Sequence, residues 1–302
     1  RVREHMSGAR EIRQRIAAVG KTRQITSAMQ RIAYIRMGRA QQRARQVRPY
    51  SQSLFRIVAR MLEQHQDHRS PLMAQRVPAH RVGMIVVTTD KGLCGALNTR
   101  LLHMCITQML SWQAAGREVS VTVIGARGLG AMRRAGARIV AQAVGVADLA
   151  PDDVTALMGA AAVPLHQFID GRIDELFVAT NRFINALSFE PVLARILPFS
   201  RELAELPAVH AGEVAVPYLY EPEPGPVIDA LLLRYVETVI YRAIVENAAC
   251  EQSARMTAMK AATDNADRMI DELTHQYHKS RQEAITRELA EIVAGADALR
   301  SG

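Results

Sequence analysis

The sequence predicts an α/β protein in which two long terminal helices enclose a domain with a mostly parallel sheet. Three observations support this fold class. After Pro226 no proline interrupts the amphipathic stretch that makes up segment 226–299, and segment 7–62 is rich in helix-forming residues. Segment 78–215 alternates β-branched runs with helical segments. Because apolar residues recur at helical spacing in both terminal stretches, we expect these stretches to pair as an antiparallel coiled coil.

The first helix is predicted from the absence of proline between Glu11 and Val47 and from its apolar spacing. Pro49 is expected to kink or interrupt this helix, because proline removes a hydrogen-bond donor and clashes with the preceding turn. Residues 51–62 then resume it. The apolar positions expected to face the partner helix are Ile12, Ile16, Val19, Ile25, Met29 and Ile32.

Positive charge is concentrated on the first helix. Residues 1–60 contain fifteen Arg or Lys and two Glu, a net charge of +13, whereas the whole chain is +8. A helix this basic predicts an acidic partner: nucleic acid, a membrane surface or an acidic protein surface. Arginines fall on most faces of the helix, which disfavours a membrane surface. Few aromatic residues accompany them, which disfavours nucleic acid.

The middle of the chain has the strand and helix order of an α/β domain. Residues 191–198 are flanked by prolines, so that strand is expected at an edge of the sheet. The predicted strands are 82–88, 119–125, 138–144, 175–180 and 191–198, and the predicted helices are 96–114, 126–135 and 154–171.

The last helix has apolar or small residues that alternate at spacings of four and three. This spacing is typical of the seam of a left-handed coiled coil and therefore predicts one partner helix. The alternative is that each terminal helix packs separately on the middle domain. The seam residues are Ala266, Ile270, Leu273, Tyr277, Ser280 and Ala284.

Composition and motifs favour a protein without catalytic chemistry of its own. Three cysteines without regular spacing argue against a disulfide framework, and the chain lacks both an apolar run of membrane-spanning length and an apolar signal region. Neither 90–95 nor 125–130 has the spacing of a P-loop or a dinucleotide fingerprint, so both are interpreted as simple turns. Cys94 is interpreted as a packed small residue, and His65 and His68 as part of a solvated loop.

Five stretches, in order along the chain, resemble the gamma subunit of an F-type ATP synthase. The most specific is 285–298, with Ile285, Thr286, Glu288, Glu291 and Gly295 at defined positions of the family's C-terminal signature. The resemblance covers nearly the whole length and implies a Rossmann-like middle domain. The other stretches are 25–29 ahead of 39–41, 90–95 with Asn98, 218–222 and 246–259.

The resemblance implies a rotor shaft that couples ion flow through a membrane ring to ATP synthesis or hydrolysis at a hexamer of alpha and beta subunits. Such a chain is a non-catalytic subunit, with no catalytic, cofactor-binding or metal-binding residues expected. The implied partners are the alpha, beta, epsilon and c-ring subunits. The implied location is peripheral, on the cytoplasmic face of the bacterial inner membrane, with membrane association through the complex and no nucleic acid.

Individual contact residues are carried over from the family by position. The residues expected to contact the hexamer are Met29, Arg36, Arg39, Arg255, Arg281, Gln282, Thr286 and Glu288. The residues expected near the membrane ring are Tyr218, Tyr220, Glu221 and Glu223.

The sequence departs from the family pattern at several positions on the helices. Tyr34 and Ile35 stand where the family usually has Ala or Ser, and Arg31 where it usually has Met. These bulkier residues imply either a local adjustment of the coiled coil or a different partner surface, and they raise the hypothesis of a divergent, second-copy ATP synthase. Cys250 and His278 also replace a usual Ser and Asn. Two other classes stay open: a nucleotide-binding enzyme with helical arms, and a coiled-coil protein that binds nucleic acid through the basic helix.

Overall fold

The protein consists of two long terminal helices and an inserted α/β domain, as the sequence predicts. The computed structural model describes residues 2–65, 67–145, 151–185, 188–200, 221 and 223–300. The first helix spans 63 residues and the last 77. The elements are α1 (Val2–Gln64), η1 (Pro71–Met73), β1 (Arg81–Val87), α2 (Leu97–Ala114), β2 (Glu118–Ile124), α3 (Ala126–Arg134), β3 (Arg138–Ala143), α4 (Pro151–Ile169), β4 (Glu175–Asn185), β5 (Ser188–Leu197) and α5 (Pro224–Arg300).

Contacts divide the chain into two units, and each terminal helix contributes to both. The first, here called the helical-pair unit, comprises Arg1–Ala33 and Met256–Gly302. The second, here called the sheet unit, comprises Tyr34–Arg255. Residues 201–215 of the predicted α/β domain lie outside the described residues.

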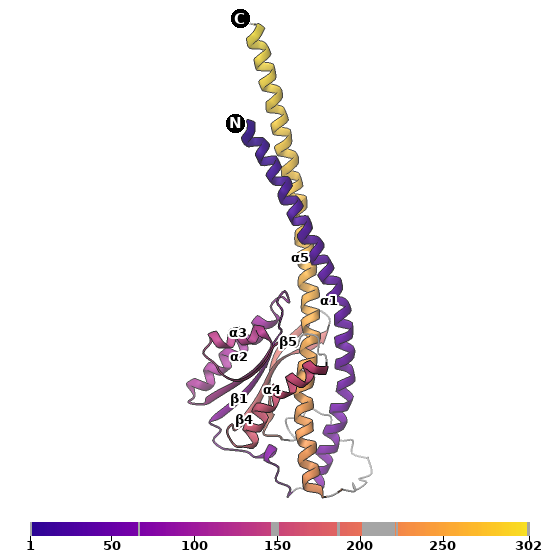
Figure 1. Ribbon diagram of the computed structural model, residues 1–302, viewed down its shortest axis with the longest axis vertical. Coiled ribbons are helices and arrows are strands. Elements are labelled where there is room, and N and C mark those ends of the chain that lie inside the picture. Colours follow the sequence, from indigo (N-terminus) through magenta and orange to yellow (C-terminus); the bar gives the residue numbers. More distant parts are fainter. Residues whose placement is uncertain are drawn as a thin grey trace. The chain divides into compact units, whose positions relative to one another are not determined.

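The sheet unit contains a five-stranded, mostly parallel sheet in the order β3-β2-β1-β4-β5. Strands β1 to β4 pair in parallel, and β5 pairs antiparallel with β4 at the edge. The expected edge strand is thus confirmed, and Pro191 lies within it opposite Asn181. In the view of Figure 1, α2 and α3 lie on one side of the sheet and α4 lies on the other.

Strand β1 explains why both faces of the sheet are buried. Val82, Met84 and Val86 belong to one core cluster, whereas Ile85 and Val87 belong to another. Successive side chains of a strand point to opposite faces, so an unbroken apolar run supplies two cores at once. The first cluster includes residues of α2, and the second includes residues of α4, α1 and α5.

Segments of both terminal helices in the sheet unit pack onto the core cluster of Ile85. Phe55 of α1 and Tyr235 of α5 have ring centroids 5.5 Å apart, and Phe199 lies 5.6 Å from Tyr235. Ile228 and Leu232 of α5 are fully buried in the same cluster. The alternative was that each terminal helix packs separately on the middle domain. It is correct in part for these segments, because they pack on the sheet, but they also pack on each other.

Pro49 does not interrupt α1, which corrects the interruption expected from the sequence. The helix is continuous from Val2 to Gln64 with Pro49 inside it. A proline in a helix costs about 3 kcal/mol. Leu54 and Phe55, 6% and 7% exposed, lie just beyond it, and burying side chains of this kind contributes roughly 1.5–3 kcal/mol each. Packing of the turns after Pro49 thus offsets its cost.

In the helical-pair unit, α1 and α5 run antiparallel. The hydroxyls of Thr26 and Thr263 are hydrogen bonded at 2.8 Å, and Arg23 forms an ion pair with Asp267. As the α1 partner moves from residue 26 back to residue 23, the α5 partner moves forward from 263 to 267. The predicted antiparallel pairing is therefore confirmed within this unit.

The seam predicted on α5 is confirmed, but the seam predicted on α1 is partly wrong. Ala266 is buried, and the other five predicted α5 seam residues are half-buried. On α1, Ile25 and Ile32 are 60% and 53% exposed, whereas their neighbours Thr26 and Ala33 are 9% and 1% exposed. The seam of α1 therefore includes a threonine that an apolar pattern overlooks. Thr26 fits there because its hydroxyl finds a partner across the pair.

Candidate protein-interaction surfaces

Arginines of α1 are exposed in the segment where contact residues were expected. Arg31, Arg36 and Arg39 are exposed, and Met29 is half-buried. The three arginines belong to the helix that carries the whole excess of positive charge of the chain. Exposed arginines on a rigid helix suit recognition of carboxylates, because the guanidinium presents several donors in a fixed geometry.

Large apolar side chains are also exposed on α1. In the helical-pair unit these are Ile25 and Ile32. In the sheet unit they include Tyr34 and Ile35, which are 64% and 57% exposed. Exposed apolar groups in such numbers typically mark protein contacts. Because Tyr34 and Ile35 face outward, their bulk requires no adjustment of the coiled coil. It alters the outer surface instead.

The end of α5 presents a second exposed surface of mixed character. Ile285, Leu289 and Ile292 are 46%, 58% and 62% exposed. They alternate with exposed polar residues. The sequence-predicted contact residues Arg281, Gln282, Thr286 and Glu288 are all exposed on it.

Arg255 differs from the other candidate contact residues because it is buried, with 8% of its surface exposed. Its guanidinium forms an ion pair with Glu251 at 2.6 Å and donates to the carbonyl of Gly92 at 3.2 Å. Glu251 is 7% exposed. Desolvation raises the pKa of Glu251, and the charge and hydrogen bond of Arg255 oppose that rise. A glutamate four residues before an arginine on a helix is a recognisable pairing signal, and sequence reasoning missed it here.

The turn 90–95 follows β1 and is ordered by its own hydrogen bonds. Asn98 donates to the hydroxyl of Thr89 at 2.7 Å and accepts from the Thr89 N–H at 3.2 Å. The Thr89 hydroxyl donates to the carbonyl of Lys91 at 2.6 Å. Cys94 is 2% exposed, and its pKa is raised by burial. It is a packed residue of the turn, as the sequence analysis expected.

The carboxylate of Asp90 occupies the place where an α/β fold would hold a phosphate. Its Oδ1 accepts from Ala126 N–H, at the start of α3, and from Gly145 N–H, both at 3.0 Å. Helix N-termini favour such an anion. A Cβ added at Gly125, where φ is +94°, would lie 2.5 Å from the Thr88 carbonyl oxygen. Gly125 therefore serves close packing and a positive φ, which supports the interpretation of 125–130 as a simple turn.

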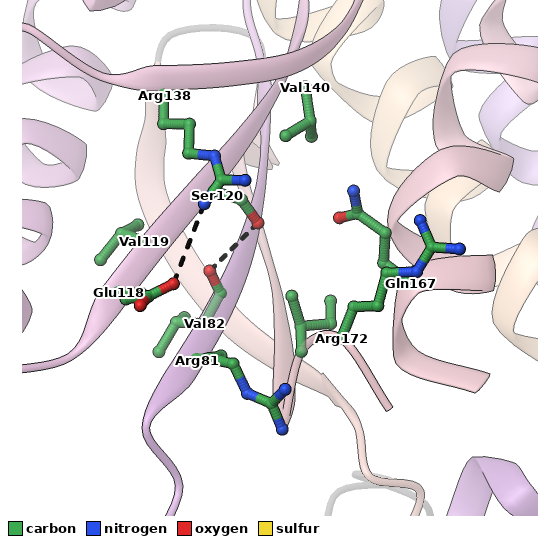
Figure 2. Close-up of a pocket in the computed structure, with 10 residues that line it drawn as sticks. Arg81, Val82, Glu118, Val119, Ser120, Arg138, Val140, Gln167 and Arg172 are labelled. Atoms are coloured by element: carbon green, nitrogen blue, oxygen red, sulfur yellow. Dashed lines mark hydrogen bonds and ion pairs between the residues drawn. The ribbon is translucent and has the colours of Figure 1, made fainter. Parts of the chain in front are cut away.

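A small pocket with a mixed polar and apolar lining lies at the amino ends of β1, β2 and β3 (Figure 2). It has a volume of about 140 Å³ and is bordered by Arg81, Glu118 and Arg138, which begin β1, β2 and β3. Arg138 pairs with Glu118 at 3.8 Å. Ligand pockets usually measure roughly 300–1,000 Å³ and lie at the carboxyl ends of the strands in open α/β sheets. This pocket therefore does not support a nucleotide site.

Asp174 anchors the start of β4 to the start of β1. Its side chain is 4% exposed and forms an ion pair with Arg81 at 2.7 Å. Its carboxylate also accepts from the backbone N–H groups of His80 and Arg81 at 3.0 and 2.8 Å. Burial acts to raise the pKa of Asp174, but these hydrogen bonds and the charge of Arg81 hold it below its usual value.

His68 and the three cysteines are enclosed by the fold to different degrees. His68 is not part of a solvated loop, as the sequence analysis expected, because its side chain is 17% exposed and lies 2.9 Å from Asp229 of α5. The three cysteines are free and buried. Burial raises the pKa of Cys105 to about 12 and also raises that of Cys250. Across the described residues, no group of three or more His, Cys, Asp or Glu is placed to hold a metal ion.

The residues expected near a membrane ring are only partly described. Glu221 and Glu223 are exposed just before α5, whereas Tyr218 and Tyr220 lie outside the described residues. Within the described part of the chain, no helix is long and apolar enough to cross a membrane.

Exposed charged and apolar side chains on long helices are typical of surfaces that contact other proteins. A sequence model described as ATP synthase matches residues 8–299, which places the chain among ATP synthase subunits. The ATP synthase gamma chain of Nitrosospira multiformis is 46% identical over 295 residues, 97% of this chain and 100% of the relative. That of Thiobacillus denitrificans is 44% identical over 296 residues, with the same coverage. The chain belongs to the ATP synthase gamma chain family, which forms the central stalk.

Solved structures agree with the fold. A chain from the central stalk and c-ring of the Tetrahymena thermophila mitochondrial ATP synthase superposes with a TM-score of 0.59 at 18% identity, covering 79% of this chain and 99% of that chain. A chain from the Euglena gracilis mitochondrial enzyme superposes with a TM-score of 0.55 at 16% identity, covering 91% and 96%. At these identities the structural similarity is evidence for the fold alone. It confirms the predicted helical termini around a mostly parallel sheet, and no comparison supports the nucleic-acid alternative.

Proposed function

We propose that the chain is the central rotor shaft of an F-type ATP synthase, coupling ion flow through a membrane ring to ATP synthesis or hydrolysis at the alpha–beta hexamer. The observation that carries the proposal is the full-length relationship to ATP synthase gamma chains, 46% identical across 97% of this chain and 100% of the relative. The long helices fit the role, because 77 residues of α5 correspond to about 115 Å of helix.

A shaft of this kind does mechanical work by binding different subunit states unequally. A rotating chain shifts an equilibrium only to the extent that its contacts favour one state over another. The contacts must also be weak enough individually to be released at each step. Exposed ion pairs contribute about 0–1 kcal/mol each, which suits the exposed arginines of α1.

The hexamer-contacting residues are proposed in two groups. Met29, Arg36 and Arg39 form the first group on α1, where the arginines present positive charge to an acidic lining. Arg281, Gln282, Thr286 and Glu288 form the second group at the exposed end of α5. The exposed apolar residues of the same segment, Ile285 and Leu289, bury surface when the end of the helix is enclosed.

The opposite end of the shaft is proposed to meet the epsilon subunit and the c ring. Glu221 and Glu223, exposed at the start of α5, belong to this surface, and Tyr218 and Tyr220 are assigned to it by sequence position. The chain is then a peripheral component on the cytoplasmic face of the bacterial inner membrane, associated with the membrane through the complex.

Co-expression with the alpha and beta subunits of the same source tests the proposal. We expect native mass to show one copy of this chain per three alpha–beta pairs and ATPase turnover that depends on the chain. Charge reversal at Arg36 and Arg39 should weaken assembly, because like charges facing each other cost several kcal/mol. Reversal at the exposed Arg133 and Arg134 of α3 is the matched control. If the co-expressed chain stays out of the complex while the alpha and beta subunits assemble without it, the proposal is contradicted.

The same preparation addresses the divergent, second-copy hypothesis. The exposed bulk of Tyr34 and Ile35 predicts that the chain assembles better with its own alpha and beta subunits than with a second set from the same cell. Equal assembly and equal ATPase activity with both sets would remove the hypothesis. Retention on DNA that vanishes at physiological salt is expected from any basic helix and carries no specific function.

A further inference from the structure

The small pocket at the amino ends of β1, β2 and β3 lies in a second positive segment of the chain. Residues 81–145, which form these strands with α2 and α3, contain eight Arg or Lys and two Asp or Glu, a net charge of +6. Residues 1–60 are +13 and the whole chain is +8, so all other residues sum to −11. A concave site within charge of one sign concentrates ions of the opposite sign.

The size of the pocket fits one small anion. Its volume is about 140 Å³, and a water molecule takes about 30 Å³ in the liquid, so it holds a few waters or one small ion. Figure 2 shows Glu118 and Arg138 on one side of the pocket and Gln167 and Arg172 on the other. Val140 and other apolar residues line it between them, and an apolar lining strengthens electrostatic attraction by lowering the local dielectric constant.

Two arginines of the lining can turn toward an anion at little cost. Arg138 lies 3.8 Å from Glu118, with both side chains 74% exposed, and Arg172 lies 3.0 Å from Asp170, with side chains 70% and 46% exposed. Exposed ion pairs of this kind contribute little stability, so either guanidinium can exchange its carboxylate for a ligand. Arg81, the third arginine of the lining, is instead held by a buried carboxylate.

Gln167 brings an unsatisfied polar group to the pocket. Its carboxamide oxygen is buried and has no hydrogen-bond partner among the described residues. In Figure 2 the carboxamide lies across the pocket from Ser120. A buried polar atom without a partner is unfavourable, whereas a half-turn of the carboxamide directs its two N–H groups to the same place. An anion in the pocket gives those N–H groups an acceptor.

We infer that the pocket binds a small tetrahedral oxyanion of the phosphate class, held by the guanidinium groups of Arg138 and Arg172 and by the carboxamide of Gln167. A tetrahedral anion presents oxygen atoms in several directions, which suits donors on opposite sides of a pocket. Guanidinium groups also pair with phosphate through two parallel hydrogen bonds. The phosphate is either a free ion or the headgroup of a lipid. The site belongs to the isolated chain and does not depend on the proposed rotor function.

Titration of the isolated full-length chain with inorganic phosphate at constant ionic strength tests the site. We expect saturable binding by calorimetry, with amide NMR shifts concentrated at the residues that line the pocket. Arg138→Gln and Arg172→Gln should each raise the Kd roughly tenfold, the effect of losing one hydrogen bond to a charged group. Arg134→Gln is the matched control, because it removes an exposed arginine of α3 outside the pocket, and it should leave the Kd unchanged.

Glu118 and Gln167 offer variants with opposite expected effects. Glu118→Gln should lower the Kd roughly two- to fivefold, because it releases Arg138 and removes a repulsion. Gln167→Leu keeps a side chain of similar size without a donor, so it should raise the Kd roughly two- to tenfold. The thermal midpoint of this variant should not fall, because the oxygen that it removes has no partner. Weaker binding is then separated from loss of structure.

Vesicles distinguish a lipid headgroup from free phosphate. Phosphatidylcholine vesicles that contain phosphatidic acid present a phosphate monoester at their surface, and plain phosphatidylcholine vesicles are the comparison. Cosedimentation with the first kind alone, abolished by soluble phosphate and by Arg138→Gln, would identify the headgroup as the ligand. Saturable binding of inorganic phosphate without cosedimentation would identify the free ion.

Two results would overturn the inference. One is that the unaltered chain binds neither inorganic phosphate nor the vesicles that contain phosphatidic acid. The other is that Arg134→Gln weakens binding as much as Arg138→Gln does, which would show diffuse attraction to positive charge in place of a defined site. Assembly with the alpha and beta subunits tests the proposed function separately, so failure of one leaves the other standing.

Discussion

Ala266 lies in the seam of the helical pair, and enlarging it is the most direct structural test of the pairing. Ala266 is 7% exposed, and its neighbour Asp267 pairs with Arg23 of α1. The change Ala266→Leu adds three carbon atoms where the two helices meet. Ala261→Leu makes the same change on the same helix at an exposed position, so differences in helix propensity cancel between the two variants.

The size of the effect follows from the packing. Overfilling a closely packed site costs about 1–3 kcal/mol, since side chains and backbone must shift to admit the added atoms. Applied to opening of the helical pair, that cost raises the open population by roughly five- to 150-fold. The control should change it by less than about 0.5 kcal/mol, as is usual for a surface substitution.

Native-state amide exchange of the isolated chain measures this opening segment by segment. We expect Ala266→Leu to speed exchange in 18–33 and 256–275, with β1 and β2 unchanged because they belong to the sheet unit. Equal exchange in both variants would refute the assignment of Ala266 to the seam. An equal loss of protection in the sheet strands would refute the division of the chain into two units.

Three further predictions concern stability and thiol chemistry. Asp174→Asn should cost about 1.5–3 kcal/mol at pH 7, the value of hydrogen bonds to a charged group, measured by urea unfolding. Because the pKa of Asp174 is lowered in the folded chain, its contribution is complete above the unfolded-state value of about 4 and declines as the pH falls through the lowered pKa. The difference in stability between the variant and the original chain should therefore shrink as the pH falls below about 4. A difference that stays constant would contradict the assigned ion pair. The three buried thiols should resist a thiol reagent at neutral pH in the native chain and react fully in denaturant; rapid native labelling would show that they are accessible. Thr26→Val should weaken the helical pair by about 1 kcal/mol as judged by amide exchange, since it leaves the Thr263 hydroxyl without its partner, and no change would remove that hydrogen bond from the seam.

The fold was largely predictable because its main elements depend on local patterns. Fully apolar runs such as 82–87 mark strands buried on both faces, and the spacing around Ala266 marks a coiled-coil seam. The interruption expected at Pro49 was wrong because a local rule was applied to a position where tertiary packing offsets the cost of the proline. Ile25 and Ile32 were misplaced because an apolar pattern does not register a seam position taken by Thr26.

The candidate surfaces were less predictable, since they depend on contacts between distant residues. The bonds of Asp90 to Ala126 and Gly145, and that of Arg255 to Gly92, join segments that no periodicity connects. Matching a family motif also does not tell whether a side chain is exposed. Arg255 and Arg281 were therefore both placed among the residues expected to contact the hexamer. One of them is buried and the other exposed.

Rotation of this chain inside an immobilised alpha–beta hexamer is the measurement that tests the central claim most directly. A bead fixed to an exposed residue of the sheet unit, such as a cysteine introduced at Leu110, reports the motion of single complexes supplied with ATP. The rotor account predicts continued rotation in one direction that stops when the chain is cross-linked to the hexamer, together with ATP hydrolysis. Sustained hydrolysis by complexes whose chain stays stationary would contradict it.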